Sequence, residues 1–178
     1  MFKLVAVVAV LLIIIVAALA IFVATRPKSF RFERRTRIKA PPPAVFALIQ
    51  DFHNWRRWSP WEDLDPALKR DYGGAARGVG AVYGWEGNNK AGTGRMEITL
   101  AAAPSQVVVD LQFIKPFKAR NTAEFTITPT EDGSEVVWAM YGPNSTVGKI
   151  MSLFMSMDAM LGKSFDEGLA RMKAAAEG

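Results

Sequence analysis

Few side chains in this sequence could do nucleophilic or metal chemistry. The chain of 178 residues has no Cys and a single His, which excludes thiol catalysis, Cys-ligated zinc or iron–sulfur sites and multi-His metal centres. A Ser–His–Asp arrangement would have to use His53 as its base. A lone His on a short surface helix is usually not catalytic, so we do not expect His53 to act as a base.

Carboxylates could supply the remaining acid–base chemistry. Glu86, Glu97 and Glu124 fall in segments with strand periodicity, but each lies opposite the large apolar residues of its own strand, so we expect all three to face solvent. The acidic loop at 62–65 lacks the twelve-residue pattern of a calcium site. No phosphate-binding or dinucleotide-binding glycine loop is present. We therefore expect no catalytic residue, no metal and no cofactor.

The N-terminal segment predicts a membrane-spanning helix. Residues 4–24 form a run without a charge, a Pro or a Gly. At about 1.5 Å per residue the run spans roughly 30 Å, the thickness of the hydrocarbon core of a bilayer. A cleaved signal peptide beginning near Lys3 is the alternative. The run is longer than the usual apolar region of such peptides, and Ala24-Thr25-Arg26 is a poor cleavage site.

The positive charge of the chain is concentrated just after this run. Between Arg26 and Lys39 there are seven bases and one acid, whereas residues 40–178 carry 14 bases and 16 acids. The globular part is therefore slightly acidic, which argues against nucleic-acid binding. The basic segment suits contact with anionic headgroups and favours a single-pass protein with a cytoplasmic domain. A periplasmic domain is the alternative, because a short N-terminus with one Lys can also stay inside.

The remaining residues first alternate as in strands and then follow helical spacing. After a juxtamembrane linker at 25–29, residues 30–176 are expected to form one domain. The alternation predicts an antiparallel sheet with one covered face. The expected elements are, in order, a strand at 29–39 whose apolar face Arg34 interrupts, short helices at 44–51 and 52–58, about six strands between 68 and 140, and a single amphipathic helix at 146–176.

This order resembles the START-like superfamily, and in particular its polyketide cyclase/dehydrase-type (SRPBCC) branch, over roughly residues 30–176. The segments that carry the resemblance are Ile38-Lys-Ala-Pro-Pro-Pro-Ala-Val-Phe46, Trp55-Arg-Arg-Trp-Ser-Pro-Trp61 and the glycine-rich tract 78–87. The resemblance implies an α+β helix-grip fold of the START/Bet v 1 type, in which a curved antiparallel sheet surrounds a long C-terminal helix and leaves an apolar cavity between them. Here one transmembrane helix precedes that fold.

Large, adaptable apolar side chains lie on the faces that are expected to meet. Aromatic rings supply broad apolar contact, and Met fills irregular space. The same side chains would also suit a solid core, so pocket and packed core both remain open from the residues alone. The candidate ligand-binding residues are Trp85, Met96, Phe113, Phe125, Trp138 and Met140 on the strands and Phe154, Met157 and Leu161 on the helix.

Three tryptophans, Trp55, Trp58 and Trp61, form a separate cluster. Trp55 and Trp58 can share one helical face, because residues three apart are neighbours on a helix. The cluster could border a cavity mouth or lie at a membrane interface, where Trp is favoured. The alternative is that it pins the short helices against the sheet.

These observations predict a membrane-anchored binding module for an apolar or lipid-like small molecule. The expected partners are a hydrophobic small molecule or lipid and the membrane itself. One alternative is a polyketide cyclase/dehydratase-like enzyme, which needs an acid or base facing the cavity. Another is a structural or regulatory partner of other membrane proteins, with a filled core and no ligand.

Overall fold

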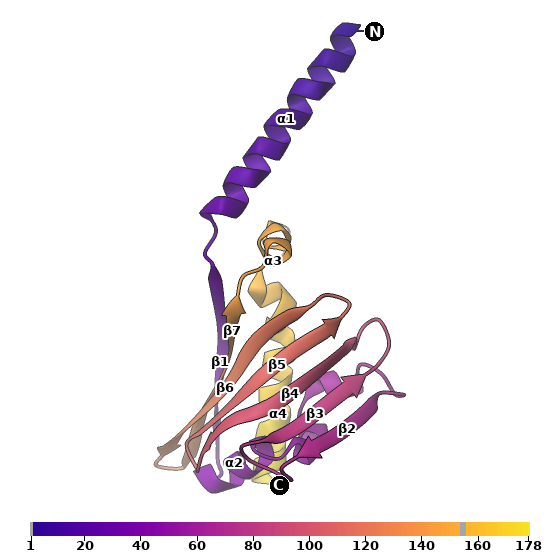
Figure 1. Ribbon diagram of the computed structural model, residues 1–178. Coiled ribbons are helices and arrows are strands. Elements are labelled where there is room, and N and C mark those ends of the chain that lie inside the picture. Colours follow the sequence, from indigo (N-terminus) through magenta and orange to yellow (C-terminus); the bar gives the residue numbers. More distant parts are fainter. Residues whose placement is uncertain (1, 154–155) are drawn as a thin grey trace.

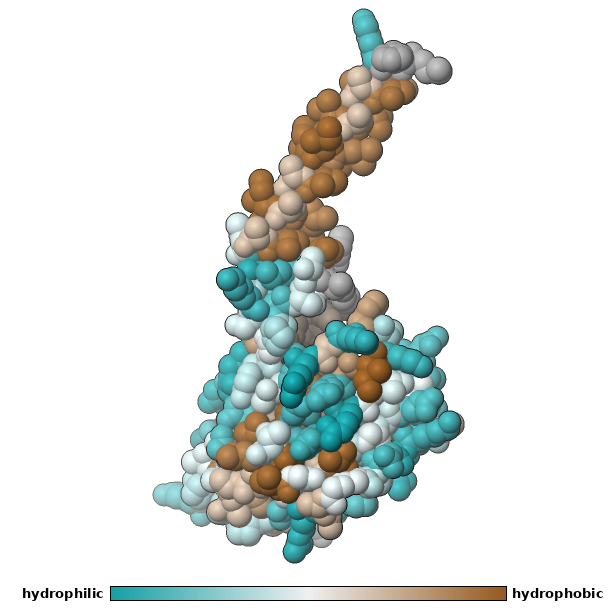
Figure 2. Space-filling view, in the orientation of Figure 1, coloured by the Kyte–Doolittle hydropathy of each residue, from teal (hydrophilic) through white to brown (hydrophobic). Residues whose placement is uncertain are grey.

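An N-terminal helix, α1 (Phe2–Thr25), extends from a separate folded domain (Figure 1). The computed structural model describes residues 2–153 and 156–178. Figure 2 shows hydrophobic side chains along α1, in contrast with the largely polar surface of the domain. Among the described residues, α1 is the one helix long and apolar enough to cross a membrane. Its 24 residues correspond to about 36 Å of helix.

Seven strands of the described chain form a single antiparallel sheet in the order β1-β7-β6-β5-β4-β3-β2. The first strand therefore pairs with the last, and the others follow one another as a meander. Period-two alternation buries one face, as in β6, where Ala123, Phe125 and Ile127 are buried. The strands are β1 (Ser29–Ile38), β2 (Lys69–Gly74), β3 (Ala81–Glu86), β4 (Thr93–Ala102), β5 (Gln106–Lys115), β6 (Ala119–Thr130) and β7 (Gly133–Pro143).

The sheet curves around the C-terminal helix α4 (Lys163–Glu177) (Figure 1). Phe165, Leu169 and Met172 on α4 are buried against it. Three short elements between β1 and β2 complete the core: α2 (Pro42–Ile49), which begins with two prolines, and the 3₁₀ helices η1 (Phe52–Arg57) and η2 (Pro60–Asp63). This is the helix-grip arrangement, so the expected fold class is confirmed.

The prediction of one continuous helix at 146–176 is wrong in its N-terminal part, before residue 158. Helix α3 (Thr146–Met151) ends in a turn at Ser152 and Leu153, and helical structure resumes with a π-helical turn, η3 (Asp158–Gly162), that leads into α4. The Ser152 hydroxyl donates to the carbonyl of Lys149 at 2.6 Å. Such local side-chain bonds compete with continued helix, and apolar spacing does not report them.

Because α1 is followed closely by β1, the sheet has an end near α1 and a far end. The α1 end contains the start of β1 and, by antiparallel pairing, the end of β7, the β5–β6 turn and the β3–β4 turn. The far end contains α2 and the loop at 75–80 between β2 and β3. Figure 1 shows α3 beside the last turn of α1 and the C-terminus at the far end.

The basic segment runs along β1 away from α1. Ten residues of strand cover about 33 Å, so Arg37 and Lys39 lie near the far end. Arg34 faces inward, where it pairs with Asp158, and its Nε lies 3.4 Å from Oδ1 of Asp166. Arg37 and Lys39 therefore lie well beyond the screening length of about 8 Å from the α1 end of the sheet, whereas Arg26, Lys28 and the exposed Arg31 lie near that end.

Candidate ligand-binding site

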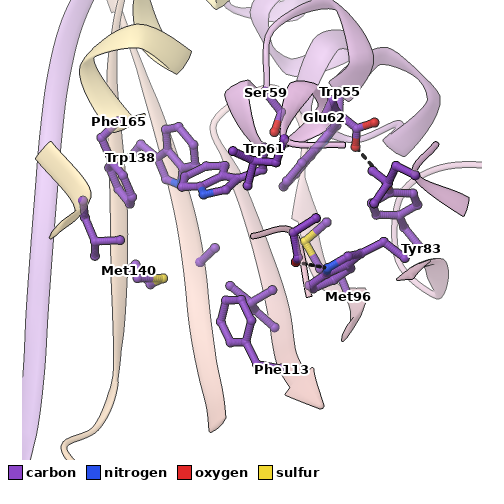
Figure 3. A pocket seen from close by; sticks show the side chains of 17 residues that line it. Trp55, Ser59, Trp61, Glu62, Tyr83, Met96, Phe113, Trp138, Met140 and Phe165 are labelled. Atoms are coloured by element: carbon purple, nitrogen blue, oxygen red, sulfur yellow. Dashed lines mark hydrogen bonds between the residues drawn. The ribbon is translucent and has the colours of Figure 1, made fainter. Parts of the chain in front are cut away.

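A partly enclosed cavity of about 130 Å³ lies between the sheet and the C-terminal helical segment (Figure 3). Its lining is almost entirely apolar and aromatic. An apolar cavity of about 150 Å³ can hold a benzene-sized molecule, so this space accommodates one ring or a short alkyl segment. The lining residues are Trp55, Ser59, Trp61, Glu62, Leu64, Leu68, Tyr83, Trp85, Ala91, Met96, Leu111, Phe113, Ala123, Trp138, Met140, Leu161 and Phe165.

The cavity lies toward the α1 end of the sheet. Trp85 is one residue from the end of β3, Phe113 two from the end of β5 and Met140 three from the end of β7. Ala91, in the β3–β4 turn, and Leu64, before β2, line it as well. Leu64 is exposed, so the lining reaches the protein surface on this side.

Six of the nine predicted ligand-binding residues line the cavity, namely Trp85, Met96, Phe113, Trp138, Met140 and Leu161. Phe125 does not: it is fully buried beside Trp138, with ring centroids 5.1 Å apart. Met157 packs on the core without lining the space. Phe154 lies outside the described residues.

Trp85 forms one wall because its cross-strand partner is Gly94. A Cβ on Gly94 would come within 2.3 Å of the Trp85 ring, so only glycine lets the indole lie flat on this strand. The indole N–H donates to the carbonyl of Ala91 at 3.1 Å. The ring is thus held at both its face and its edge.

The tryptophan cluster mainly pins the short helices, as one of the two sequence interpretations predicts. Trp55 Nε1 donates to the carbonyl of Ile49 at 2.9 Å, and Trp58 Nε1 to that of Leu48 at 3.0 Å. Trp58 is fully buried, whereas Trp55 also contributes an edge to the cavity. Trp61 lies at the cavity wall, with its ring 5.3 Å from that of Trp138.

One carboxylate faces this otherwise apolar space. Glu62 has a side chain only 7% exposed, and Figure 3 marks its bond with the hydroxyl of Tyr83, which donates to Oε1 at 2.7 Å. Arg70 Nε donates to Oε2, also at 2.7 Å. Burial, reinforced by the bond to Glu62, raises the pKa of Tyr83, so the phenol stays neutral and acts as a donor at physiological pH.

The carboxylates singled out in the strands lie elsewhere. Glu86 is exposed, while Glu97 and Glu124 are partly exposed on the outer face, where Glu97 pairs with Arg95 and Glu124 accepts a bond from Gln106. The expectation that they face away from the cavity is confirmed. His53 is exposed and bonds to Asp51. In the described ranges no group of three His, Cys, Asp or Glu residues could hold a metal ion.

Sequence reasoning missed the polar part of the site. Glu62 lies in a 3₁₀ turn, where neither helical nor strand periodicity indicates which way a side chain points. Tyr83 shares the inner face of β3 with Trp85, and that shared parity is the signal that would have added it to the candidates. Ser59, also buried at the cavity, precedes Pro60 in the same unpatterned stretch.

Comparison with solved structures shows the same fold in several proteins of low sequence identity. A protein of unknown function from Staphylococcus aureus has a TM-score of 0.62 at 12% identity, covering 84% of this chain and 94% of its own. The di-domain ARO/CYC protein BexL from the BE-7585A biosynthetic pathway has a TM-score of 0.62 at 16% identity, covering 89% of this chain and 53% of its own. CV1439 from Chromobacterium violaceum scores 0.55 at 13% identity, covering 85% and 99%.

No curated protein sequence matches the chain. A family model does match it, over residues 29–177, which is the whole domain from the start of β1 to the end of α4. The model is described as polyketide cyclase/dehydrase and lipid transport. Because this match covers the whole helix-grip domain, the chain belongs to the polyketide cyclase/dehydrase and lipid transport family.

Proposed function

We propose that this protein is a membrane-anchored binding module that holds an apolar or lipid-like small molecule between its sheet and its C-terminal helix. The observation that carries the proposal is the cavity with its apolar, aromatic lining, whose exposed wall at Leu64 lies at the α1 end of the sheet. Binding sites for small molecules are typically apolar with few polar groups. The family description, which includes lipid transport, supports the same function.

The size of the cavity limits what enters it. A ring or short alkyl segment fits inside, and the rest of a larger ligand would extend past Leu64 and Ala91 toward α1. Affinity would come mainly from burial, at about 25 cal/mol per Å² of apolar surface removed from water. The ligand therefore enters by one end, and its exposed part lies on the side nearest the bilayer.

Contacts between α1 and the domain support a fixed position of the cavity opening relative to α1. Lys149 Nζ donates to the carbonyl of Val23 at 3.3 Å. Asn144 bonds through its backbone N–H to the carbonyl of Lys28 at 2.8 Å and through its side chain to that of Pro27 at 3.3 Å. These bonds hold the end of α1 against the end of β7. If α1 crosses the membrane, the α1 end of the sheet faces the lipid surface.

The β5–β6 turn supports the same orientation. Phe117 at its tip is 67% exposed and lies between Lys115 and Lys118, at the α1 end of the sheet. An exposed aromatic between two lysines suits the interface of an anionic membrane, where the ring enters and the ammonium groups stay with the headgroups. Arg26 and Lys28, next to α1, favour a cytoplasmic domain.

The test is direct binding by the full chain reconstituted in lipid nanodiscs. Four tryptophans line the cavity, so a short-chain quinone should quench intrinsic fluorescence in a saturable way, and a fluorescent fatty acid should be taken up and displaced. Organic extraction of the purified protein should also release a bound small molecule. Absence of any extracted molecule, together with unsaturable quenching and no uptake, would contradict the proposal.

A cyclase or dehydratase is a second candidate, favoured by Glu62. A carboxylate at the wall of an apolar cavity is the group that proton abstraction beside a carbonyl needs. The structural similarity to BexL, an ARO/CYC protein, agrees with this candidate. One observation argues against the enzyme hypothesis: Tyr83 and Arg70 already donate hydrogen bonds to both oxygens of Glu62, so neither oxygen is free to accept a proton from a substrate.

Dehydration of a simple β-hydroxyketone separates the two candidates. The substrate 4-hydroxy-4-phenylbutan-2-one loses water to form a conjugated enone, whose absorbance is easily followed. An enzyme should accelerate this loss, and Glu62→Gln should abolish the acceleration while the quinone still binds. A binding module should leave the β-hydroxyketone unchanged.

A further inference from the structure

One hydroxyl group at the cavity has no protein partner. Ser59 is 3% exposed and lines the cavity. A serine just before a helix usually accepts a bond from the first N–H groups of that helix. The Ser59 side chain makes no such bond to η2, and it makes no other hydrogen bond to the residues that the structure describes. Its backbone is fixed, because its N–H donates to the carbonyl of Trp55 at 2.7 Å and its carbonyl accepts from the N–H of Glu62 at 3.3 Å.

The unpaired hydroxyl of Ser59 borders the cavity. In the described chain, the buried side-chain polar atom that is both unpaired and sealed off from open space is Nε1 of Trp138. The oxygen of Ser59 is unpaired without being sealed, so it touches open space, and the space that Ser59 lines is the cavity. Figure 3 shows Ser59 along the same wall as Trp61 and Glu62. Buried polar groups are nearly always paired, so we expect a molecule in the cavity to pair with this hydroxyl.

The balance of protons and lone pairs limits the partner. A serine hydroxyl has one proton and two lone pairs, whereas a carboxylate has lone pairs alone. Tyr83 uses its proton on Glu62, and Arg70 donates to the other carboxylate oxygen. The hydroxyl and carboxylate groups of the described lining therefore keep one free proton, that of Ser59, and several free lone pairs. A ligand with a proton of its own fits this surplus of lone pairs better than a carbonyl does.

The charge at the cavity disfavours an anionic ligand. Glu62 is the acid of the described lining, and no basic side chain shares that lining. A ligand carboxylate would face the Glu62 carboxylate in an apolar space without a cation of its own, which is unfavourable. A neutral group that both donates and accepts meets neither restriction.

Building on the proposed function, we propose that the ligand carries a hydroxyl group, as in an alcohol or a phenol, which hydrogen-bonds to the hydroxyl of Ser59. Ser59 thereby selects hydroxylated apolar molecules over hydrocarbons of the same shape. Burial supplies most of the affinity, and the Ser59 bond supplies the discrimination.

Three ring-sized probes test the inference with the full chain in nanodiscs. Cyclohexanol can donate and accept, cyclohexanone can only accept, and methylcyclohexane has nearly the same shape without a polar group. Each competes with the short-chain quinone, whose saturable quenching reports occupancy of the cavity. After correction for partitioning into protein-free nanodiscs, cyclohexanol should bind the wild-type chain most tightly and methylcyclohexane most weakly. In Ser59→Ala the preference for cyclohexanol over methylcyclohexane should fall by about fivefold.

Ser134→Ala is the matched control. Ser134 is fully buried, and its hydroxyl donates to the carbonyl of Ala40 at 2.7 Å, away from the cavity lining. Ser134→Ala should lower the denaturation midpoint and leave the preference among the probes unchanged. Ser59→Ala should do the opposite, because the hydroxyl that it removes has no partner in the described protein. A purely structural role for Ser59 would lower the midpoint without moving the preference.

The outcomes separate this inference from the proposed function. If neither the quinone nor any probe binds the wild-type chain, the binding function fails and the inference fails with it. If the quinone binds but the preference for cyclohexanol is absent, or is the same in Ser59→Ala, the inference is wrong while the binding function stands. If Ser59→Ala does not fold, the wild-type order decides: cyclohexanone or methylcyclohexane binding as tightly as cyclohexanol would overturn the hydroxyl assignment.

Discussion

Phe165 of α4 stacks on Trp138 of β7, with ring centroids 4.2 Å apart and planes inclined by 19°. This pair joins the C-terminal helix to β7, the second strand of the sheet, and both members line the cavity. The stack therefore sets how close the helix can approach the sheet. Stability and cavity size depend on the same two rings.

Replacing Phe165 tests that dependence. Phe165→Ala should lower the free energy of unfolding by about 3–5 kcal/mol, because it removes a fully buried ring and leaves Trp138 uncovered. Phe165→Leu keeps most of the volume and should cost less. Thermal unfolding followed by near-ultraviolet circular dichroism measures both. A small loss of stability in both variants would show that the stack contributes little.

Two buried tryptophans should respond differently to the same substitution. Trp58→Phe removes the donor to the Leu48 carbonyl and leaves that acceptor unpaired, whereas Trp138→Phe removes a donor that has no acceptor among the described residues. We expect Trp58→Phe to be the more destabilising by about 1 kcal/mol or more. Chemical denaturation of the two variants in the same detergent provides the comparison. A larger loss for Trp138→Phe would mean that its N–H is already well paired.

Filling the cavity should block binding without unfolding the domain. Ala123 is buried on β6 and lines the cavity. Ala123→Leu should abolish saturable quinone quenching and cost at most about 1–3 kcal/mol of stability. Ala101→Leu is the control, because Ala101 packs on the core near the far end of β4 without lining the cavity. Binding that survives Ala123→Leu would place the ligand elsewhere.

The stability of the protein should fall at alkaline pH because of Tyr83. Burial raises the pKa of Tyr83 in the folded chain, while an unfolded tyrosine ionises near pH 10. The unfolded state thus loses its proton first, so the stabilisation is fully present below about pH 10 and is lost as the pH rises further. Tyr83→Phe should show a smaller alkaline loss than wild type in denaturant midpoints measured from pH 8 to pH 11. Parallel losses would contradict a raised pKa.

The β5–β6 turn should enter the membrane surface. The chain has no Cys, so Phe117→Cys gives a single labelling site for an environment-sensitive fluorophore in the full protein. In anionic nanodiscs its emission should shift to the blue and be quenched by lipids carrying shallow nitroxides. Val79→Cys is the control, since Val79 is 60% exposed in the loop at the far end. Equal quenching at both positions would reject the proposed orientation.

The sequence was informative where local pattern determines structure. Alternation in β6 identifies its buried face, and the run at 4–24 identifies a helix of membrane-spanning length. Local pattern fails at Ser152 and Leu153, where α3 ends in a turn although the apolar spacing of a helix continues. It also fails for Glu62, because a 3₁₀ turn carries no periodicity to orient the side chain.

Residue types alone also do not tell whether an empty space remains between large side chains. Phe113 and Phe125 are the same amino acid on neighbouring strands of the inner face. Phe125 is enclosed by Trp55, Trp58 and Trp138, whereas Phe113 meets Trp85 at an angle of 82° and borders the void. The difference depends on where Trp55 and Trp58, from η1 and its C-cap, pack on the sheet, which is a property of the whole fold.

The connection between α1 and β1 is only three residues long, Arg26 to Lys28, and Asn144 and Lys149, which follow β7 in the sequence, brace it. A domain attached in this way has almost no reach. It cannot swing outward to deliver cargo to a distant acceptor, as a module on a long flexible tether can. If α1 is a membrane anchor and the domain binds a ligand as proposed, ligand exchange has to happen in place, with molecules that arrive by lateral diffusion in the bilayer. The protein then serves a patch of membrane about as wide as the domain itself.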